Sequence, residues 1–204
     1  MSKTVWERIE ESRSRHNVLE HPFYQRWSAG ELELDELARY AGQYRHATAA
    51  IARLSAEAAD AAPPEHRDEL RAHAVEEDGH IGLWDGFVEA VGGEIGVEPT
   101  VETAECVRSW TAGEGYLEAL ARLYAIESGQ PEIARVKREG LNEFYGINEG
   151  PATEYFQVHE SMDVEHASEA RRLIEEAITP EDEEAIVNAA ESAFAANWRL
   201  LDGV

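Results

Sequence analysis

The sequence predicts an all-α protein, a single-domain bundle of seven helices that spans residues 1–204. Apolar or small residues recur every three or four positions along most of the chain, which is the spacing of one face of an α-helix. Strand-like alternation of apolar and polar residues is absent from the sequence. A length of 204 residues with 43% hydrophobic residues is typical of one folded domain and excludes a disordered chain.

The first half of the chain predicts three helices. The N-terminal stretch MSKTVWERIEES begins the first. Pro63 and Pro64 end the second, and Gly92 and Gly93 stop the third at about Val91. The apolar face of the second helix is formed by Leu34, Leu37, Ala41, Tyr44, Thr48 and Ile51.

The second half continues the helical pattern. A short segment over 101–110 and a glycine turn precede a helix over 116–128. The run Gly129-Gln130-Pro131 breaks or kinks it, since proline lacks the amide hydrogen of the helical ladder. The helix then continues to about Tyr145, and the loop GINEGPAT leads into a long helix over 153–178. The residues 179–182 cap the last helix, with Pro180 at its first position.

The charge of the chain excludes two classes of partner. With 18 Lys+Arg against 42 Asp+Glu, the formal charge is -24. Nucleic acids and anionic membrane surfaces both attract cationic proteins, so we expect neither as a partner. Lys3 and Lys137 are the only lysines. An acidic, lysine-poor surface is typical of a halophilic protein, because carboxylates stay hydrated in concentrated salt and the salt screens their repulsion; a genome rich in arginine codons is the alternative.

Composition also bears on the compartment. Cys106 is the only cysteine, so an internal disulfide is excluded. The polar N-terminus does not resemble a signal peptide, and no apolar run approaches the ~20 residues of a membrane span. We therefore expect a soluble, cytoplasmic protein, with a homodimer as the default oligomeric state.

The strongest chemical motif is HESMDVEH, in which His159, Asp163 and His166 stand at i, i+4 and i+7. On a helix these three side chains share one face. Two histidines and one carboxylate form a ligand set that suits Fe(II), Mn or Zn. The alternative is a solvated polar face in an acid-rich chain.

Two further segments extend this motif to a dinuclear site. Glu77 and His80 form a Glu-x-x-His pair, the unit from which helical bundles build dinuclear carboxylate centres. Glu127 is a lone acid in an apolar segment, where a buried charge needs a metal or another partner, such as an arginine. His73 lies one turn before Glu77 and is expected near the site, and His46 is expected to line the same cavity. The candidate ligands of two metal ions, Fe/Fe or Fe/Mn with positions open for O₂, are Glu77, His80, Glu127, His159, Asp163 and His166.

Four segments resemble the heme-oxygenase-like dimetal oxidases, whose fold is of the TenA/PqqC type. They are HPFYQRWSAGEL, VEEDGHIGLW, YAIESGQPEIARVKREGL and YFQVHESMDVEHASEA, and they are most similar to the CADD-like p-aminobenzoate synthases. The resemblance covers about residues 21–173 and implies the same six ligands. In the family several residues separate the glutamate from the histidine before LW, whereas only Asp78 and Gly79 do so here, which leaves Glu76 as an alternative to Glu77.

The CADD-like branch implies a role in folate biosynthesis, in which a tyrosine of the protein supplies the aromatic ring and a lysine the nitrogen. The matching residues are Tyr24 and Lys137. Lys137 is the only lysine inside the chain, and a buried lysine can lose its proton whereas an arginine effectively cannot. The resemblance therefore implies O₂ and a small-molecule or self-derived substrate as the reactants.

Three alternatives remain at this point. A TenA-type thiaminase or pyrimidine hydrolase needs a cysteine in the helix of Glu127, where ALARLYAIE has none. A PqqC-like oxidase works without a metal, which the ligand set disfavours. A non-enzymatic helical interaction or regulatory protein would hold these polar residues in salt bridges and would neither bind metal nor consume O₂.

Overall fold

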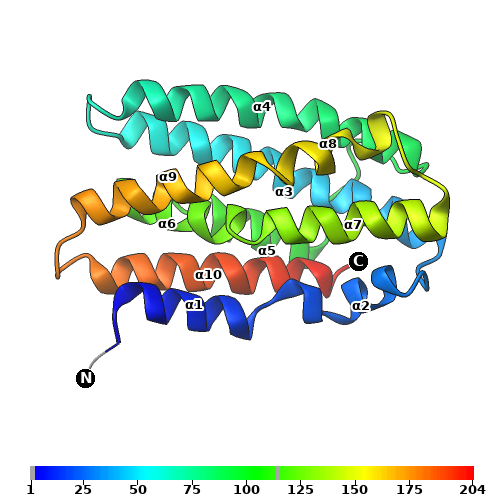
Figure 1. The fold of residues 1–204 in the computed structure, drawn as a ribbon, viewed down its shortest axis with the longest axis horizontal. Coiled ribbons are helices and arrows are strands. Elements are labelled where there is room, and N and C mark those ends of the chain that lie inside the picture. The colour runs from blue at the N-terminus through cyan, green and yellow to red at the C-terminus, as the bar shows by residue number, and fades with distance from the viewer. Residues whose placement is uncertain (1–2, 114) are drawn as a thin grey trace.

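The computed structural model describes residues 3–113 and 115–204, which form a bundle of roughly parallel and antiparallel helices (Figure 1). These residues contain ten α-helices, one short 3₁₀ helix (η1, Val18–Glu20) and no strand. The helices are α1 (Val5–Arg15), α2 (Pro22–Ser28), α3 (Leu34–Ala61), α4 (Arg67–Ala90), α5 (Val101–Trp110), α6 (Tyr116–Glu127), α7 (Gln130–Tyr145), α8 (Pro151–His159), α9 (Met162–Ala177) and α10 (Glu183–Leu201).

The all-α class is confirmed, but the number of helices is a correction to the seven expected. One added element is α2, which begins at Pro22. His21 caps the start of this helix, because its side chain accepts a hydrogen bond from the Phe23 amide. Another comes from the helix expected over 153–178, which is divided into α8 and α9. There the Ser161 hydroxyl donates to the Val158 carbonyl, a local bond that competes with the helical ladder.

The start of the last helix also differs from the expectation. Pro180 does not occupy the first helical position, because α10 begins only at Glu183. Instead, the Asp182 carboxylate accepts hydrogen bonds from the amide and the hydroxyl of Thr179, which holds residues 179–182 in a turn. The predicted break at Gly129 is confirmed, since α6 ends at Glu127 and Pro131 lies in the first turn of α7.

The buried helix α6 lies at the centre of the bundle and packs against α3, α9 and α10. Every residue from Ala119 to Glu127 is buried, so this helix brings its last residue, an acid, into the interior. The paired helices α3 and α4 lie along one edge of the bundle, with α10 and α1 along the opposite edge (Figure 1).

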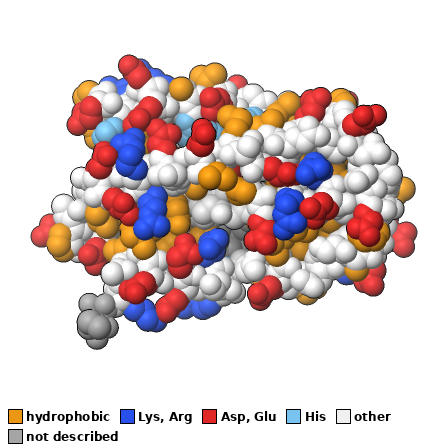
Figure 2. All heavy atoms as spheres, in the orientation of Figure 1, with side chains coloured by type: hydrophobic (Ala, Val, Ile, Leu, Met, Phe, Trp, Pro, Cys, Tyr) orange, Lys and Arg blue, Asp and Glu red, His pale blue; other side chains and the backbone are white. Residues whose placement is uncertain are grey.

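The face of the molecule shown in Figure 2 carries many acidic side chains, with Lys and Arg side chains between them. Many are paired: Arg172, for example, contacts the carboxylates of Glu69 and Glu176 at 3.1 and 2.9 Å. Exposed pairs of this kind contribute roughly 0–1 kcal/mol each. The stability of the fold therefore depends mainly on the buried core rather than on these surface ion pairs. None of the helices in the described part of the chain is long and apolar enough to span a membrane.

At Gly140 the backbone of α7 packs closely against the Trp27 side chain of α2. A Cβ atom at this position would lie 2.7 Å from Nε1 and Cδ1 of Trp27. The same indole Nε1 donates to the Lys137 carbonyl at 3.1 Å, so the contact also holds α2 against the segment of α7 that carries Lys137.

We predict opposite effects for alanine at two helical glycines. Gly140→Ala should lower the free energy of unfolding by about 1–3 kcal/mol, because the added methyl group overpacks the Trp27 ring. Gly82→Ala in α4 is the control: a Cβ there meets nothing within 4 Å, so helix propensity should raise stability by up to about 1 kcal/mol. Urea unfolding of both variants measures this, and equal shifts would contradict the packing argument.

Candidate metal centre

Seven buried side chains from four helices converge on one region of the interior. Helix α4 contributes three of them, α6 one, α8 one and α9 two. They are His73, Glu77, His80, Glu127, His159, Asp163 and His166, and each is at most 7% exposed. The structure thus brings together all six of the predicted ligands, and it adds His73.

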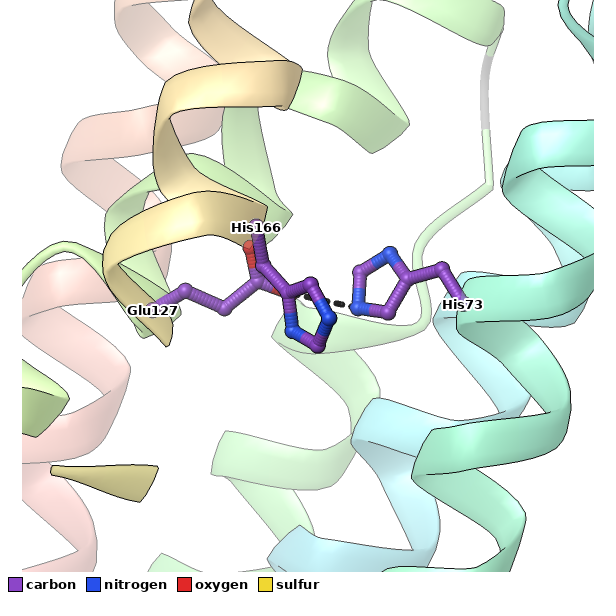
Figure 3. A group of neighbouring side chains, drawn as sticks. All are labelled: His73, Glu127 and His166. Carbon is purple, nitrogen blue, oxygen red and sulfur yellow. Dashed lines mark ion pairs between the residues drawn. The ribbon is translucent and has the colours of Figure 1, made fainter. Parts of the chain in front are cut away.

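The donor atoms fall into overlapping groups of three, each with its atoms within 4.8 Å of one another. In the first group, His73, Glu127 and His166 approach from α4, α6 and α9 (Figure 3). The second group is Glu77, His80 and His159, and the third is Glu77, Asp163 and His166. Because Glu77 and His166 each belong to two groups, the three groups form one continuous cluster of donor atoms.

Imidazole nitrogens and carboxylate oxygens of the centre lie close to one another. Nε2 of His73 lies 3.1 Å from Oε1 of Glu127, and Nδ1 of His80 lies 3.1 Å from Oε1 of Glu77. Nδ1 of His166 lies 3.7 Å from Oδ1 of Asp163. The partner of Glu127 is therefore a histidine of this centre.

The unsatisfied atoms of the centre fit a metal ion. Both carboxylate oxygens of Glu127 and of Asp163 are buried without a hydrogen bond, and so is Nε2 of His159. Buried polar atoms without partners cost about 1–3 kcal/mol each or more if charged, and native proteins keep them few. A cluster of such atoms, all of them types that bind divalent cations, fits bound iron or manganese.

Burial also shifts the proton equilibria of the centre. It raises the pKa of Asp163 to about 7 and lowers the pKa of His159 to about 4. Burial lowers the pKa of His73 as well, but the carboxylates of Glu127 and Glu77 outweigh it and raise that pKa to about 10. These carboxylates and imidazoles must be deprotonated to bind a metal, and the positive charge of a bound cation favours that form.

The structure distinguishes the two candidate glutamates of α4. Glu77 is 2% exposed and points into the centre. The side chain of Glu76 is 46% exposed, and its Oε2 accepts a hydrogen bond from Nε2 of His166 at 3.1 Å. Nδ1 of His159 is held in a similar way by the Tyr155 carbonyl, at 2.6 Å. Such outer partners orient the other ring nitrogen toward a metal.

His73 is the residue that sequence reasoning underestimated. It is predicted only as a neighbour of the site, yet it belongs to the first donor group. The signal lies in its spacing, since His73, Glu77 and His80 stand at i, i+4 and i+7 on the uninterrupted helix α4. His46, expected in the same cavity, lies outside the donor groups, and its Nε2 contacts the Val97 carbonyl at 2.8 Å.

The two residues predicted as reactants lie together in an aromatic enclosure. Lys137 is 1% exposed, and its Nζ lies 4.7–5.6 Å from the centres of five rings. Burial lowers the pKa of Lys137 to about 7. The Tyr24 ring is one of the five, and its hydroxyl lies 3.1 Å from that of Tyr40. The others are Tyr40, Tyr44, Trp84 and Phe156.

This aromatic enclosure is joined to the metal centre by packed rings. Trp84 lies over Lys137 and contacts Tyr155 with ring centres 4.7 Å apart. Tyr155 in turn stacks on His159 at 3.8 Å. A chain of ring contacts therefore connects the donor atoms to the amine without a solvent-exposed gap.

Comparison with known proteins agrees with this arrangement. Residues 38–198 match the family model described as iron-containing redox enzymes. The 4-aminobenzoate synthase of Nitrosomonas europaea is 32% identical over 213 residues, which cover 94% of this chain and 86% of the relative. The protein of the same name from Chlamydia trachomatis is 33% identical, with 91% and 85% covered. A Shewanella denitrificans protein with a heme-oxygenase-like fold superposes with a TM-score of 0.82 at 17% identity, over 99% of this chain and 92% of that one.

We predict that Fe(II), added without oxygen, stabilises the folded chain through this centre. At a free Fe(II) concentration 100-fold above the dissociation constant, the gain is about 2.7 kcal/mol, seen as a higher thermal unfolding temperature. Asp163→Ala should lose most of this gain. The exposed neighbour variant Glu165→Gln is the matched control and should keep it. An equal Fe(II)-dependent rise in both variants would argue against Asp163 as a ligand.

Proposed function

This chain belongs to the family of iron-containing redox enzymes, and we propose that this oxidoreductase is an O₂-dependent dimetal oxidase that forms 4-aminobenzoate. The proposed ligands are Glu77, His80, Glu127, His159, Asp163 and His166, which would hold two metal ions, Fe/Fe or Fe/Mn. The buried donor set supports this proposal, because carboxylates and imidazoles are the ligands of non-heme iron and of manganese.

The observation that carries the proposal is the burial of Lys137 among aromatic rings beside the donor set. The chain contains one other lysine, Lys3, at its exposed N-terminal end. Burying an ammonium group without a salt bridge is costly, and a structural role would be served equally well by an apolar side chain. The buried amine is therefore best explained as a reactant, and the formation of 4-aminobenzoate requires a source of amino nitrogen.

The residues around the centre have distinct proposed roles. Iron, when bound, would supply the electrons that reduce O₂. The five rings around Lys137 exclude water, and the lowered pKa leaves a large fraction of the amine neutral near pH 7, with its lone pair free to react. The Tyr24 ring lies 5.5 Å from the Lys137 Nζ. We propose that Tyr24 supplies the aromatic ring and Lys137 the nitrogen, with O₂ as the oxidant.

The hydrolytic alternative has less support. Helix α6 contains no cysteine, and Cys106, in α5, is fully buried. Burial raises the pKa of this thiol well above its usual value, which keeps it protonated and unreactive. A thiaminase-type nucleophile is therefore lacking in the described part of the molecule.

Reaction of the protein's own residues predicts a change of mass. After anaerobic loading with Fe(II) and exposure to O₂, peptides that contain Tyr24 and Lys137 should differ in mass from those of the untreated chain. Lys137→Arg should abolish 4-aminobenzoate formation, because arginine stays protonated. Lys3→Arg is the control and should leave the yield unchanged. If more than one 4-aminobenzoate forms per chain and both peptides keep their mass, the substrate is external.

The buried amine also predicts a particular dependence of stability on pH. The pKa of Lys137 is about 7 in the folded chain and 10.5 when unfolded. Between these values the unfolded state binds the extra proton, so this residue's contribution makes stability rise with pH, by at most about 1.4 kcal/mol per pH unit. The metal-free wild type should therefore gain stability relative to Lys137→Met between pH 7.5 and 9.5 in urea unfolding. Parallel curves would show that the lysine titrates normally.

A further inference from the structure

Two segments of the centre share one spacing. In α4, His73-x₃-Glu77-x₂-His80 places three donors at i, i+4 and i+7, and His159-x₃-Asp163-x₂-His166 does the same across α8 and α9. Each segment thus reads histidine, carboxylate, histidine. The proposed ligand set uses every member of the two segments except His73.

The two segments face each other in opposite directions. The first histidine of one meets the last histidine of the other: the rings of His73 and His166 are 4.0 Å apart, and those of His80 and His159 are 4.5 Å apart. Glu77 lies between them, in donor groups with members of both pairs. The arrangement therefore offers one pair of imidazoles at each end of the centre.

Each imidazole pair has its own carboxylate. Glu127 joins His73 and His166, and Glu77 joins His80 and His159. In Figure 3 the side chains of His73 and His166 converge with that of Glu127 from three different helices. Without His73, the first of these positions would have a single imidazole. With it, both positions have two histidines and one carboxylate, a set that suits non-heme Fe(II).

His73 itself has the features of a ligand. It is 5% exposed, and its Nε2 is buried without a hydrogen bond, 3.1 Å from Oε1 of Glu127 and 3.7 Å from Oε1 of Glu77. The competing role is that of a charged imidazole that only neutralises Glu127. That role does not account for the shared spacing of the two segments or for the ring of His166 at 4.0 Å, since a second imidazole does not stabilise a first one that is charged.

We infer that His73 is a seventh ligand, which binds the metal held by Glu127 and His166 while Glu77, His80 and His159 bind the other. The remaining ligand of the seven, Asp163, shares a donor group with Glu77 of one set and His166 of the other. This inference rests on the proposed dimetal function. On the uninterrupted helix α4, His73 lies two turns before His80 and faces the centre. Glu76 is then not a ligand but a positioning residue, which holds His166 by a hydrogen bond from outside the centre.

The test is the number of iron ions retained after anaerobic loading with ⁵⁷Fe(II) and desalting, with Mössbauer spectra of the loaded samples. The wild type should retain about two ions per chain. His73→Gln and His80→Gln should each retain about one, and the double variant should retain none. The control is His66→Gln, which removes an imidazole seven residues before His73 and outside the donor groups; it should retain two.

Two results would overturn the inference in different ways. If His73→Gln retains two irons with the wild-type Mössbauer spectrum, His73 is not a ligand, although the dimetal function stands. If the wild type itself retains no iron, the proposed function fails, and the inference fails with it.

A second measurement counts the bound imidazoles. In the wild type loaded with Co(II), each bound imidazole contributes one strongly shifted, exchangeable N–H signal to the proton NMR spectrum. Four bound histidines, His73, His80, His159 and His166, predict four such signals. Three signals, with two Co(II) ions bound per chain and all three retained in His73→Gln, would exclude His73 from the metal.

Discussion

The burial of seven titratable side chains at one place is the constraint on which the rest of this structure depends. Taking carboxylates out of water is costly unless charge of the opposite sign is supplied close by. The imidazoles supply part of it, yet several oxygens of Glu127 and Asp163 make no hydrogen bond within the chain. Bound cations would supply the rest of the compensating charge, and the surrounding helices place the donors around one common region.

The architecture follows from this requirement. Helix α6 is buried from Ala119 onward, and it ends at the residue that must reach the centre, Glu127. The break between α8 and α9 separates His159 from Asp163 and lets both face α4. Local irregularities of the chain, a kink before Pro131 and a break at Ser161, thus lie where donors enter the centre. Regular helices elsewhere provide the frame that holds them.

Lys137 is a further titratable group whose burial has to be compensated. Burial lowers the pKa of Lys137 and so favours the neutral amine, which does not need an acid partner. The ring contacts from Lys137 through Trp84 and Tyr155 to His159 place this amine and the donor set in one interior. The scarcity of lysine in the sequence and the burial of Lys137 in the structure therefore both single out Lys137 as a candidate functional residue.

The sequence by itself determined the helical class and the break at Gly129, and it predicted the six candidate ligands, with Glu76 left as an alternative to Glu77. Most of these predictions depend on local spacing, and that of Glu127 depends on the apolar residues around it. Three or four residues separate neighbours on one helix face whatever the helix packs against. Only the tertiary structure decided between Glu76 and Glu77, placed His46 outside the centre, and brought His73 to Glu127. The outcomes for Glu76, Glu77 and His73 depend on how α4 is rotated against α6 and α9, and that for His46 depends on how α3 packs against the segment of Val97. Such orientations are set by packing between segments far apart in the chain.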